Sequence, residues 1–480
     1  MKRDDLHPDL QIEYDDNRGY GVEKLPDPAY QHMWFVVPKP LPRSMKEIFS
    51  GVSTQELHRV LGRSNRVLNS LKPLSEMTKL DSLIARLIIR QEAVASSRME
   101  GTNATIDEVF SAGAGDSNPS GDVRSVVGYA KAMEQLIASI HENQYETLDT
   151  ALFKNLHRAI VEGDDSFVGI PGEFRHPGGI REVVFIGGLG RKENSTYNPA
   201  PSKHVARLMA DFIAWLKDEE LQNVILGEGL PLPVRMAVGH AYFETIHPFP
   251  DGNGRVGRMI WPIQMMLEGK APLHLSRFID AHKDGYYEGL KAWQQKLKIM
   301  PFLEYLGEAM EESLRETTET RKAIEMLPER WQGKLSVKKG SAASRILPHL
   351  MEHPIMSAED VIRLLNVSLP AATGALKQLA QAGILKEKSG RQRKQKYAAE
   401  DVLSILSRPF GSDPNDILSL LDRESTVPKR AIASVKDQGS VDVIFCQGLD
   451  GRGCRQVPPV RLRGASRRKR GVCSLCDPAK

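Results

Sequence analysis

The chain has 480 residues, which predicts about three domains at roughly 100–200 residues per domain. Hydrophobic residues make up 41% and charged residues 26%, so the composition allows a sizeable core and excludes wholesale disorder. Lys and Arg number 65 against 61 Asp and Glu, a formal net charge of +4, so no global charge points to nucleic acid or to an anionic membrane.

The two ends of the chain indicate where the protein is located and whether its body is held by disulfides. The N-terminal stretch MKRDDLHPDLQIEYDD is polar and acidic, and no apolar run reaches the ~18 residues of a membrane span. These features exclude a Sec-type signal and a membrane span, and we expect a cytoplasmic protein without a membrane partner. All four cysteines lie near the C-terminus, which excludes a disulfide-built scaffold for the body.

The first element that the sequence predicts is an amphipathic helix. Residues before Met45 are rich in Pro, Tyr, Asp and Lys without clear periodicity, and we expect an irregular or lightly ordered lead-in there. From Leu80 to Glu100 apolar residues recur near one helical face. Gly101 then predicts a helix stop, and the spacing Thr105-x-x-Glu108 predicts a capping box that opens a second, short helix.

Further helical patterns follow, with one strand signal among them. Helices are expected around residues 126–140, 152–161, 205–221 and 234–246, and a long charged helix around 301–335. The β-branched and aromatic run Glu182–Ile186, followed by two glycines, predicts one arm of a β-hairpin. The fold class is therefore mainly α with a small β element.

A compact unit is predicted after residue 340. Helical patterns cover residues 342–352, a segment opened by Ser357-x-x-Asp360, and residues 370–381. A basic turn from Lys386 to Lys396 follows, before Tyr397. Three short helices and a two-stranded, basic wing are typical of a winged helix-turn-helix domain.

The segment from His247 to Arg258, HPFPDGNGRVGR, has the chemistry of a phosphate site. Gly252 and Gly254 allow positive φ and close backbone approach, so amides can converge on an anion where the next helix begins. Arg255 and Arg258 are three apart and share a helix face, where each guanidinium can bind phosphate oxygens.

Two further residues of this segment add catalytic chemistry. Asp251 is a hard oxygen ligand suited to Mg²⁺ between phosphates, and His247 can act as a general base. The Gly-Lys-[Ser/Thr] ending of a P-loop is missing from the segment, so a Walker-type reading fails. His247 and Asp251 without further His or Cys nearby do not make a closed zinc site.

These twelve residues resemble, at every defining position, the signature of the Fic domain family. The resemblance implies transfer of AMP from ATP to a protein Ser, Thr or Tyr hydroxyl with release of pyrophosphate. It implies that His247 is the base and that Asp251 binds Mg²⁺. The nucleotide-binding residues that it implies are Gly252, Asn253, Gly254, Arg255, Gly257 and Arg258.

Other segments resemble further parts of the same family. The stretch from Gly172 to Pro201 resembles the region that carries a β-hairpin flap, and strand addition could clamp an extended target segment there. The flap residues would be Val183, Val184, Phe185 and Ile186. Tyr287 resembles a residue beside the nucleotide, although a core aromatic is an equally good interpretation.

A built-in inhibitory element is predicted at the end of the first helix. Ser96, Glu100 and Gly101 fit the family's inhibitory motif, and Ser96 and Glu100 share a helix face. A carboxylate placed on Arg258 would compete with the γ-phosphate of ATP. The N-terminal position of the motif resembles the class whose brake is intramolecular.

The C-terminal segments leave two questions open. The stretch 386–396 holds six basic residues and one acidic residue, which suits contact with DNA, but a solvated turn or a protein contact is an equal alternative. The tail could bind zinc or carry free thiols, and its basic run between Arg452 and Arg470 could bind nucleic acid. The candidate zinc ligands are Cys446, Cys454, Cys473 and Cys476.

The sequence therefore predicts a Fic-type helical bundle with a small β-hairpin flap, a winged helix-turn-helix domain and a Cys-containing basic tail. The expected divisions are 1–115 with the inhibitory helix, 116–335 with the Fic domain and exit helix, 340–405, and 406–480. The main functional alternatives are a DNA-binding regulator with the Fic body as a sensor, and a Fic enzyme that uses another donor or removes AMP. Formation of a homo-oligomer stays open.

Overall fold

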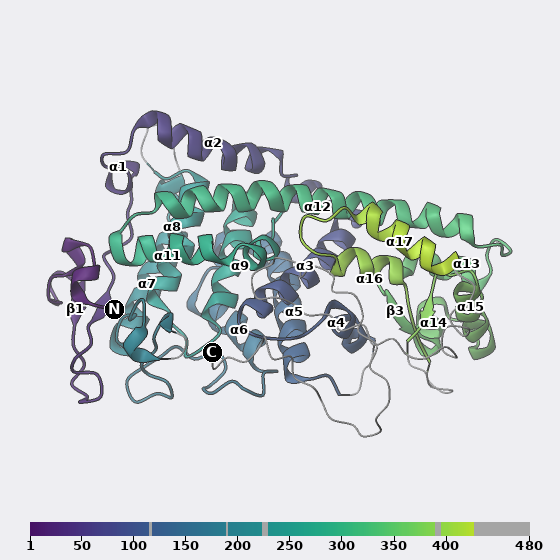
Figure 1. Ribbon diagram of the computed structural model, residues 1–480, viewed down its shortest axis with the longest axis horizontal. Helices are drawn as coiled ribbons and strands as arrows, with labels where there is room; N and C mark the ends of the chain where they lie inside the picture. The colour runs from purple at the N-terminus through teal and green to yellow at the C-terminus, as the bar shows by residue number, and fades with distance from the viewer. Residues whose placement is uncertain (115–117, 189–190, 223–228, 389–394, 427–480) are drawn as a thin grey trace, which may run out of the picture. The chain divides into compact units, whose positions relative to one another are not determined.

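Helices dominate the chain, as the amphipathic patterns predict (Figure 1). The computed structural model describes residues 1–114, 118–188, 191–222, 229–388 and 395–426. Residues 1–425 cluster as one compact unit. The four tail cysteines and the basic run that contains Arg452 and Arg470 lie outside the described residues, so the zinc and nucleic-acid interpretations of the tail stay predictions.

The N-terminal lead-in is more ordered than expected. Strand β1 (Gly21–Glu23) pairs antiparallel with β2 (Phe35–Val37), with Val22 opposite Val36. Val22 and Val36 of this sheet belong to a separate cluster of buried residues. The other members are Leu6, Leu10 and Tyr197. The expectation of an irregular or lightly ordered segment did not include these two strands, because strands of three residues are too short to leave an alternating pattern in the sequence.

The signature segment begins directly after α8 (Leu232–Ile246) and runs into the first turns of α9 (Asn253–Leu267). Every residue of α8 is buried, because α2, α7, α9, α11 and α12 all pack against it (Figure 1). Such an all-round burial fixes the C-terminal end of α8, where the signature begins. The surrounding helices are α1 (Met45–Ile48), α2 (Thr54–Ser70), α5 (Gly121–Asn143), α6 (Thr150–Val161), α7 (Ser202–Leu216), α10 (Ser276–Ala281), α11 (Lys283–Lys296) and α12 (Met300–Lys334).

The predicted inhibitory helix forms nearly as expected. Helix α3 (Lys79–Met99) starts at a capping box made by Thr78 and Asp81. The predicted Thr105 and Glu108 capping box opens α4 (Ile106–Gly113). Helix α3 packs against α5, α9 and α10, and its C-terminal turn reaches α9, which carries the second half of the signature.

The predicted β-hairpin arm is not a strand. In the segment Glu182–Ile186 only Ile186 is paired, in an isolated antiparallel bridge with Tyr197. The ring of Phe185 instead packs near Tyr30 and Phe35 of the N-terminal region. The strand prediction is wrong because this tertiary packing satisfies the apolar side chains without a ladder.

The C-terminal helices and strands follow the predicted order. Helices α13 (Ala342–Ile346), α14 (Ala358–Leu365) and α15 (Leu369–Gln381) are followed by β4 (Lys386–Glu387) and β5 (Lys396–Ala398). The sheet has three strands rather than the expected two, because β3 (Ile355–Ser357) pairs with β5 in the order β3-β5-β4. Helices α16 (Glu400–Ser407) and α17 (Pro414–Thr426) complete the described region. The winged-helix assignment stays a prediction, as do the domain boundaries.

None of the helices in the described part of the chain combines the length and the apolar composition that crossing a membrane requires.

Candidate active site

His247 stands at the C-terminal end of α8 in the left-handed conformation, at φ 50° and ψ 63°. Its amide still donates to the Phe243 carbonyl at 2.9 Å, so the helix closes before the chain turns away. A non-glycine residue rarely adopts a positive φ, and such strain persists only where the surroundings enforce it. The turn therefore has to be held by neighbouring residues.

Arg175 holds this turn from a buried position. Its guanidinium donates to four backbone carbonyls, those of Glu182, Ala200, Ile246 and His247, at 2.8–3.1 Å. Burial lowers the pKa of Arg175 to about 9. Sequence analysis assigned no role to this residue, because a lone arginine gives no signal of where its five donors will point.

The loop after His247 is closed by Asn253. The Asn253 side chain accepts from the Phe249 amide at 2.8 Å and donates to the Phe249 carbonyl at 2.9 Å. Both polar atoms of this side chain are therefore used within the loop. Binding of an anion would depend on the backbone amides at the start of α9. Gly252 precedes α9 at φ 75°, the left-handed conformation that glycine adopts without cost.

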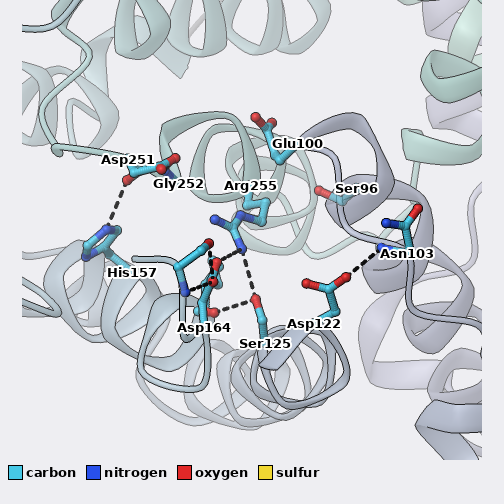
Figure 2. Close-up of polar contacts among 12 residues, drawn as sticks. Ser96, Glu100, Asn103, Asp122, Ser125, His157, Asp164, Asp251, Gly252 and Arg255 are labelled. Carbon is cyan, nitrogen blue, oxygen red and sulfur yellow. Dashed lines mark hydrogen bonds and ion pairs between the residues drawn. The ribbon is translucent and has the colours of Figure 1, made fainter. Parts of the chain in front are cut away.

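His157 of α6 also contacts this loop, and the sequence did not indicate this residue. Its ring stacks on Phe249 with centroids 3.9 Å apart. The Gly172 amide donates to Nδ1 at 2.9 Å, so Nε2 carries the proton that reaches the Asp251 carbonyl at 3.1 Å (Figure 2). Burial lowers the pKa of His157 to about 4, so the ring is neutral at physiological pH.

Asp251 presents a half-exposed carboxylate at the rim of the loop. One oxygen accepts from the Gly252 amide at 2.6 Å, and the other lies 3.4 Å from an Arg181 nitrogen. Among the described residues no group of three His, Cys, Asp or Glu side chains could hold a metal ion. A single carboxylate fits Mg²⁺ only together with substrate phosphates and waters, which is the usual way this ion binds.

Arg255 points into the protein. Figure 2 shows its side chain extending toward Ser125 and Asp164; one nitrogen donates to the Ser125 hydroxyl at 2.9 Å and lies 3.8 Å from the Asp164 carboxylate. The side chain is buried, and its Nε atom has no hydrogen-bond partner among the described residues. The role of Arg255 in nucleotide binding stays a prediction, and it requires that this side chain keeps one donor for a phosphate oxygen.

Arg258 meets the predicted inhibitory residues directly. Its Nε atom donates to the Ser96 hydroxyl and its Nη2 atom to the Ser96 carbonyl, both at 2.8 Å. Nη2 also reaches a Glu100 carboxylate oxygen at 2.7 Å. Burial would lower the pKa of Arg258, but the Glu100 charge and hydrogen bond raise it above the ordinary value. Gly101, at φ 91°, ends the inhibitory helix just after this contact.

Two glycines of α9 are required by close approaches. A Cβ atom on Gly254 would lie 2.3 Å from a Glu100 carboxylate oxygen, and one on Gly257 would lie 2.3 Å from Glu244 Oε1. Gly254 thus makes room for the Glu100 contact. Gly257 is a structural contact between α8 and α9, and nothing in its surroundings assigns it a direct role toward a nucleotide.

The tyrosine pair of α11 divides into a buried and an exposed residue. Tyr286 is buried and donates its hydroxyl to His240 Nε2 at 2.8 Å, while His240 Nδ1 donates to the Gly257 carbonyl at 2.9 Å. Tyr287 is half exposed and packs edge-on against Tyr286. Burial and the charge of Glu100 raise the pKa of the Tyr287 phenol. It stays the candidate for the adenine side.

Comparisons with known protein families agree with this arrangement. Residues 58–137 match the family model described as Fic/DOC family N-terminal, and residues 147–264 match the Fic/DOC family. A Protein adenylyltransferase Fic of Drosophila mojavensis is 30% identical over 190 residues, which are 39% of this chain and 32% of that protein. A probable protein adenylyltransferase of Aquifex aeolicus is 26% identical over 180 residues, 36% of this chain and 46% of that protein.

The chain therefore contains a Fic/DOC domain preceded by the N-terminal region of that family. It spans less than half the length of the curated relatives given above. A Fic family protein of Desulfovibrio desulfuricans G20 aligns with 72% of this chain and 97% of that chain at 20% identity and a TM-score of 0.43, a likeness too weak to carry an argument.

Proposed function

We propose that this chain is an autoinhibited adenylyltransferase that moves AMP from ATP to a protein hydroxyl. The observation that carries the proposal is the pairing of the signature loop with the Glu100 contact on Arg258. A general base, a backbone anion site and a guanidinium already occupied by a carboxylate come together where α8, α9 and α3 meet. The names of the relatives, which describe protein adenylyltransferases, support the same reaction.

In the proposed reaction His247 accepts the proton of the target hydroxyl while its oxygen attacks the α-phosphorus of ATP. The bond between this phosphorus and the bridging oxygen breaks, and pyrophosphate leaves. His247 Nε2 makes no hydrogen bond to any described residue, so it is available for the hydroxyl. Mg²⁺, held by Asp251 and the phosphates, would neutralise part of the negative charge.

The anion site is built from backbone. The amides at the start of α9, after Gly252, point toward the loop, and the helix dipole favours a phosphate there. Arg258 would bind the γ-phosphate once Glu100 has left. Preorganised donors of this kind stabilise charge without reorganisation during the reaction.

Autoinhibition follows from competition for one guanidinium. Arg258 is buried and already has the Ser96 hydroxyl, the Ser96 carbonyl and the Glu100 carboxylate as acceptors. A γ-phosphate needs the same donors, so the enzyme is inhibited until Glu100 moves. The segment with Val183, Val184 and Phe185, next to the paired Ile186, would dock the target protein by adding one backbone strand.

Within the described residues, the C-terminal unit gives the DNA-binding alternative no specific support. Helix α15, at the position of a recognition helix, carries a single charged residue, Lys377. On the wing, Lys388 pairs with Asp107 and Glu400, and Lys396 donates to the Ser111 carbonyl. These lysines already contact the body of the protein, so the enzyme is the better proposal.

Labelled ATP tests the proposed chemistry. The Glu100→Gly variant, incubated with Mg²⁺ and a panel of candidate target proteins, is expected to transfer label from the α-phosphate and none from the γ-phosphate. Transfer from the γ-phosphate would indicate phosphorylation instead. Equal transfer from UTP or GTP would show that the donor is another nucleotide, and absence of transfer with every donor would contradict the enzyme.

A further inference from the structure

Glu244 is a buried carboxylate directed at the candidate base. It lies on α8, one turn before His247, and its Oε2 atom is 3.6 Å from His247 Nδ1. Its side chain is 8% exposed, and the side chain of His247 is 21% exposed. The contact is longer than a hydrogen bond, but hydrogen bonds in active sites commonly shorten when substrate binds.

His247 is the one residue in the described part of the chain that pairs with the Glu244 carboxylate. Glu244 Oε1 and His247 Nδ1 are both buried without a hydrogen-bond partner among the described residues, and the only ion pair of Glu244 there is with His247. A buried carboxylate without compensation destabilises a fold. Gly257 leaves the space for Oε1, since a Cβ there would lie 2.3 Å away. The fold therefore makes room for a buried carboxylate whose ion-pair partner among the described residues is His247.

We propose that Glu244 positions His247 and stabilises its protonated form during transfer, a role that rests on the proposed function. The target hydroxyl gives its proton to Nε2 as its oxygen bonds to the α-phosphorus and pyrophosphate departs. His247 then carries a positive charge, with Nδ1–H directed at Glu244 Oε2. A carboxylate behind an imidazole fixes both its tautomer and its orientation.

The surroundings keep Glu244 ionised. Burial would raise the pKa of this carboxyl, but the contact with His247 and the positive charges nearby lower it below its ordinary value. The titratable and charged groups that face it are His240 from α8, His247 directly after α8, Arg258 from α9, and Tyr286 and Tyr287 from α11. A neutral Glu244 could not stabilise an imidazolium, so ionisation is a condition of the proposed role.

The test compares Glu244→Gln and Glu244→Asp in the Glu100→Gly background. Glu268→Gln is the matched control, because Glu268 pairs with Arg235 at the opposite end of α9 from the signature loop. We expect Glu244→Gln to lower kcat by about 10–100-fold with little change in KM for ATP, as for other residues that orient a catalytic group. Glu244→Asp should retain part of the activity, and the control should retain all of it.

Two readouts separate positioning from a structural role. If Glu244 acts through its charge, Glu244→Asp should be more active than Glu244→Gln even when it is no more stable, whereas a structural role predicts that activity follows the melting temperature in both variants. The tautomer of the His247 ring, read by NMR from its nitrogen chemical shifts, should change in Glu244→Gln, because the carboxylate that faces Nδ1 has been removed.

The readouts also separate this proposal from the proposed function. An unchanged His247 tautomer together with unchanged kcat would overturn the role of Glu244. If no variant transfers AMP, the proposed function fails, and the His247 tautomer alone decides whether Glu244 acts on His247: a changed tautomer supports the coupling and an unchanged one overturns it.

Discussion

Replacing Glu100 with glutamine tests whether the inhibitory contact limits nucleotide binding. The change keeps the shape of the side chain and removes the charge that faces Arg258 across 2.7 Å. Hydrogen bonds to charged groups contribute about 1.5–3 kcal/mol. The Glu100 side chain is 31% exposed, so solvent screens part of this contribution. We expect about 1–2 kcal/mol, which corresponds to roughly 5–30-fold tighter binding of ATP.

Isothermal titration calorimetry with Mg²⁺ and a non-hydrolysable ATP analogue measures this effect. Glu142→Gln is a suitable control, since Glu142 is exposed near the end of α5. In an Arg258→Ala background the Glu100→Gln change should no longer alter the affinity, because the two residues act as a pair. Equal affinities of the wild type and Glu100→Gln would refute the competition between Glu100 and the γ-phosphate.

Three further predictions concern the support of the site. Gly257→Ala should destabilise the protein by about 1–3 kcal/mol, because the new methyl group meets the buried Glu244 carboxylate; thermal denaturation checks this, and an unchanged melting temperature would contradict it. Arg175→Lys should lower transfer activity, because an ammonium cannot donate to all four carbonyls of the turn; activity equal to that of the parent would show that the turn holds without the guanidinium. Stability should fall between about pH 6.5 and pH 4, because His157 and His240 are neutral in the folded protein and take up protons first in the unfolded chain. Urea unfolding across this range measures the loss, and a smaller slope in His157→Asn would assign part of it.

The sequence was most informative where local chemistry sets the outcome. The capping box of Thr105 and the amphipathic pattern up to Glu100 predicted helix ends within a residue or two. The inhibitory residues Ser96 and Glu100 were expected to face Arg258, and the structure brings the three together.

What the sequence left out depends on long-range packing. His157 and Arg175 support the loop from segments about 70–90 residues earlier, with no spacing or motif to connect them to it. The run Glu182–Ile186 has strand composition, yet its neighbours in space are aromatic rings of the N-terminal region. Glu244 lies one turn from His247, so helical spacing alone could have indicated it.

Mass spectrometry of the intact protein tests the central claim most directly. The wild type, Glu100→Gly and Glu100→Gly/His247→Ala proteins are incubated with Mg²⁺ and ATP. Autoinhibited transfer predicts a gain of one AMP that appears or grows in Glu100→Gly, on the protein itself or on an added target, and disappears in the double variant. A gain that persists without His247, or that does not change when Glu100 is lost, would contradict it.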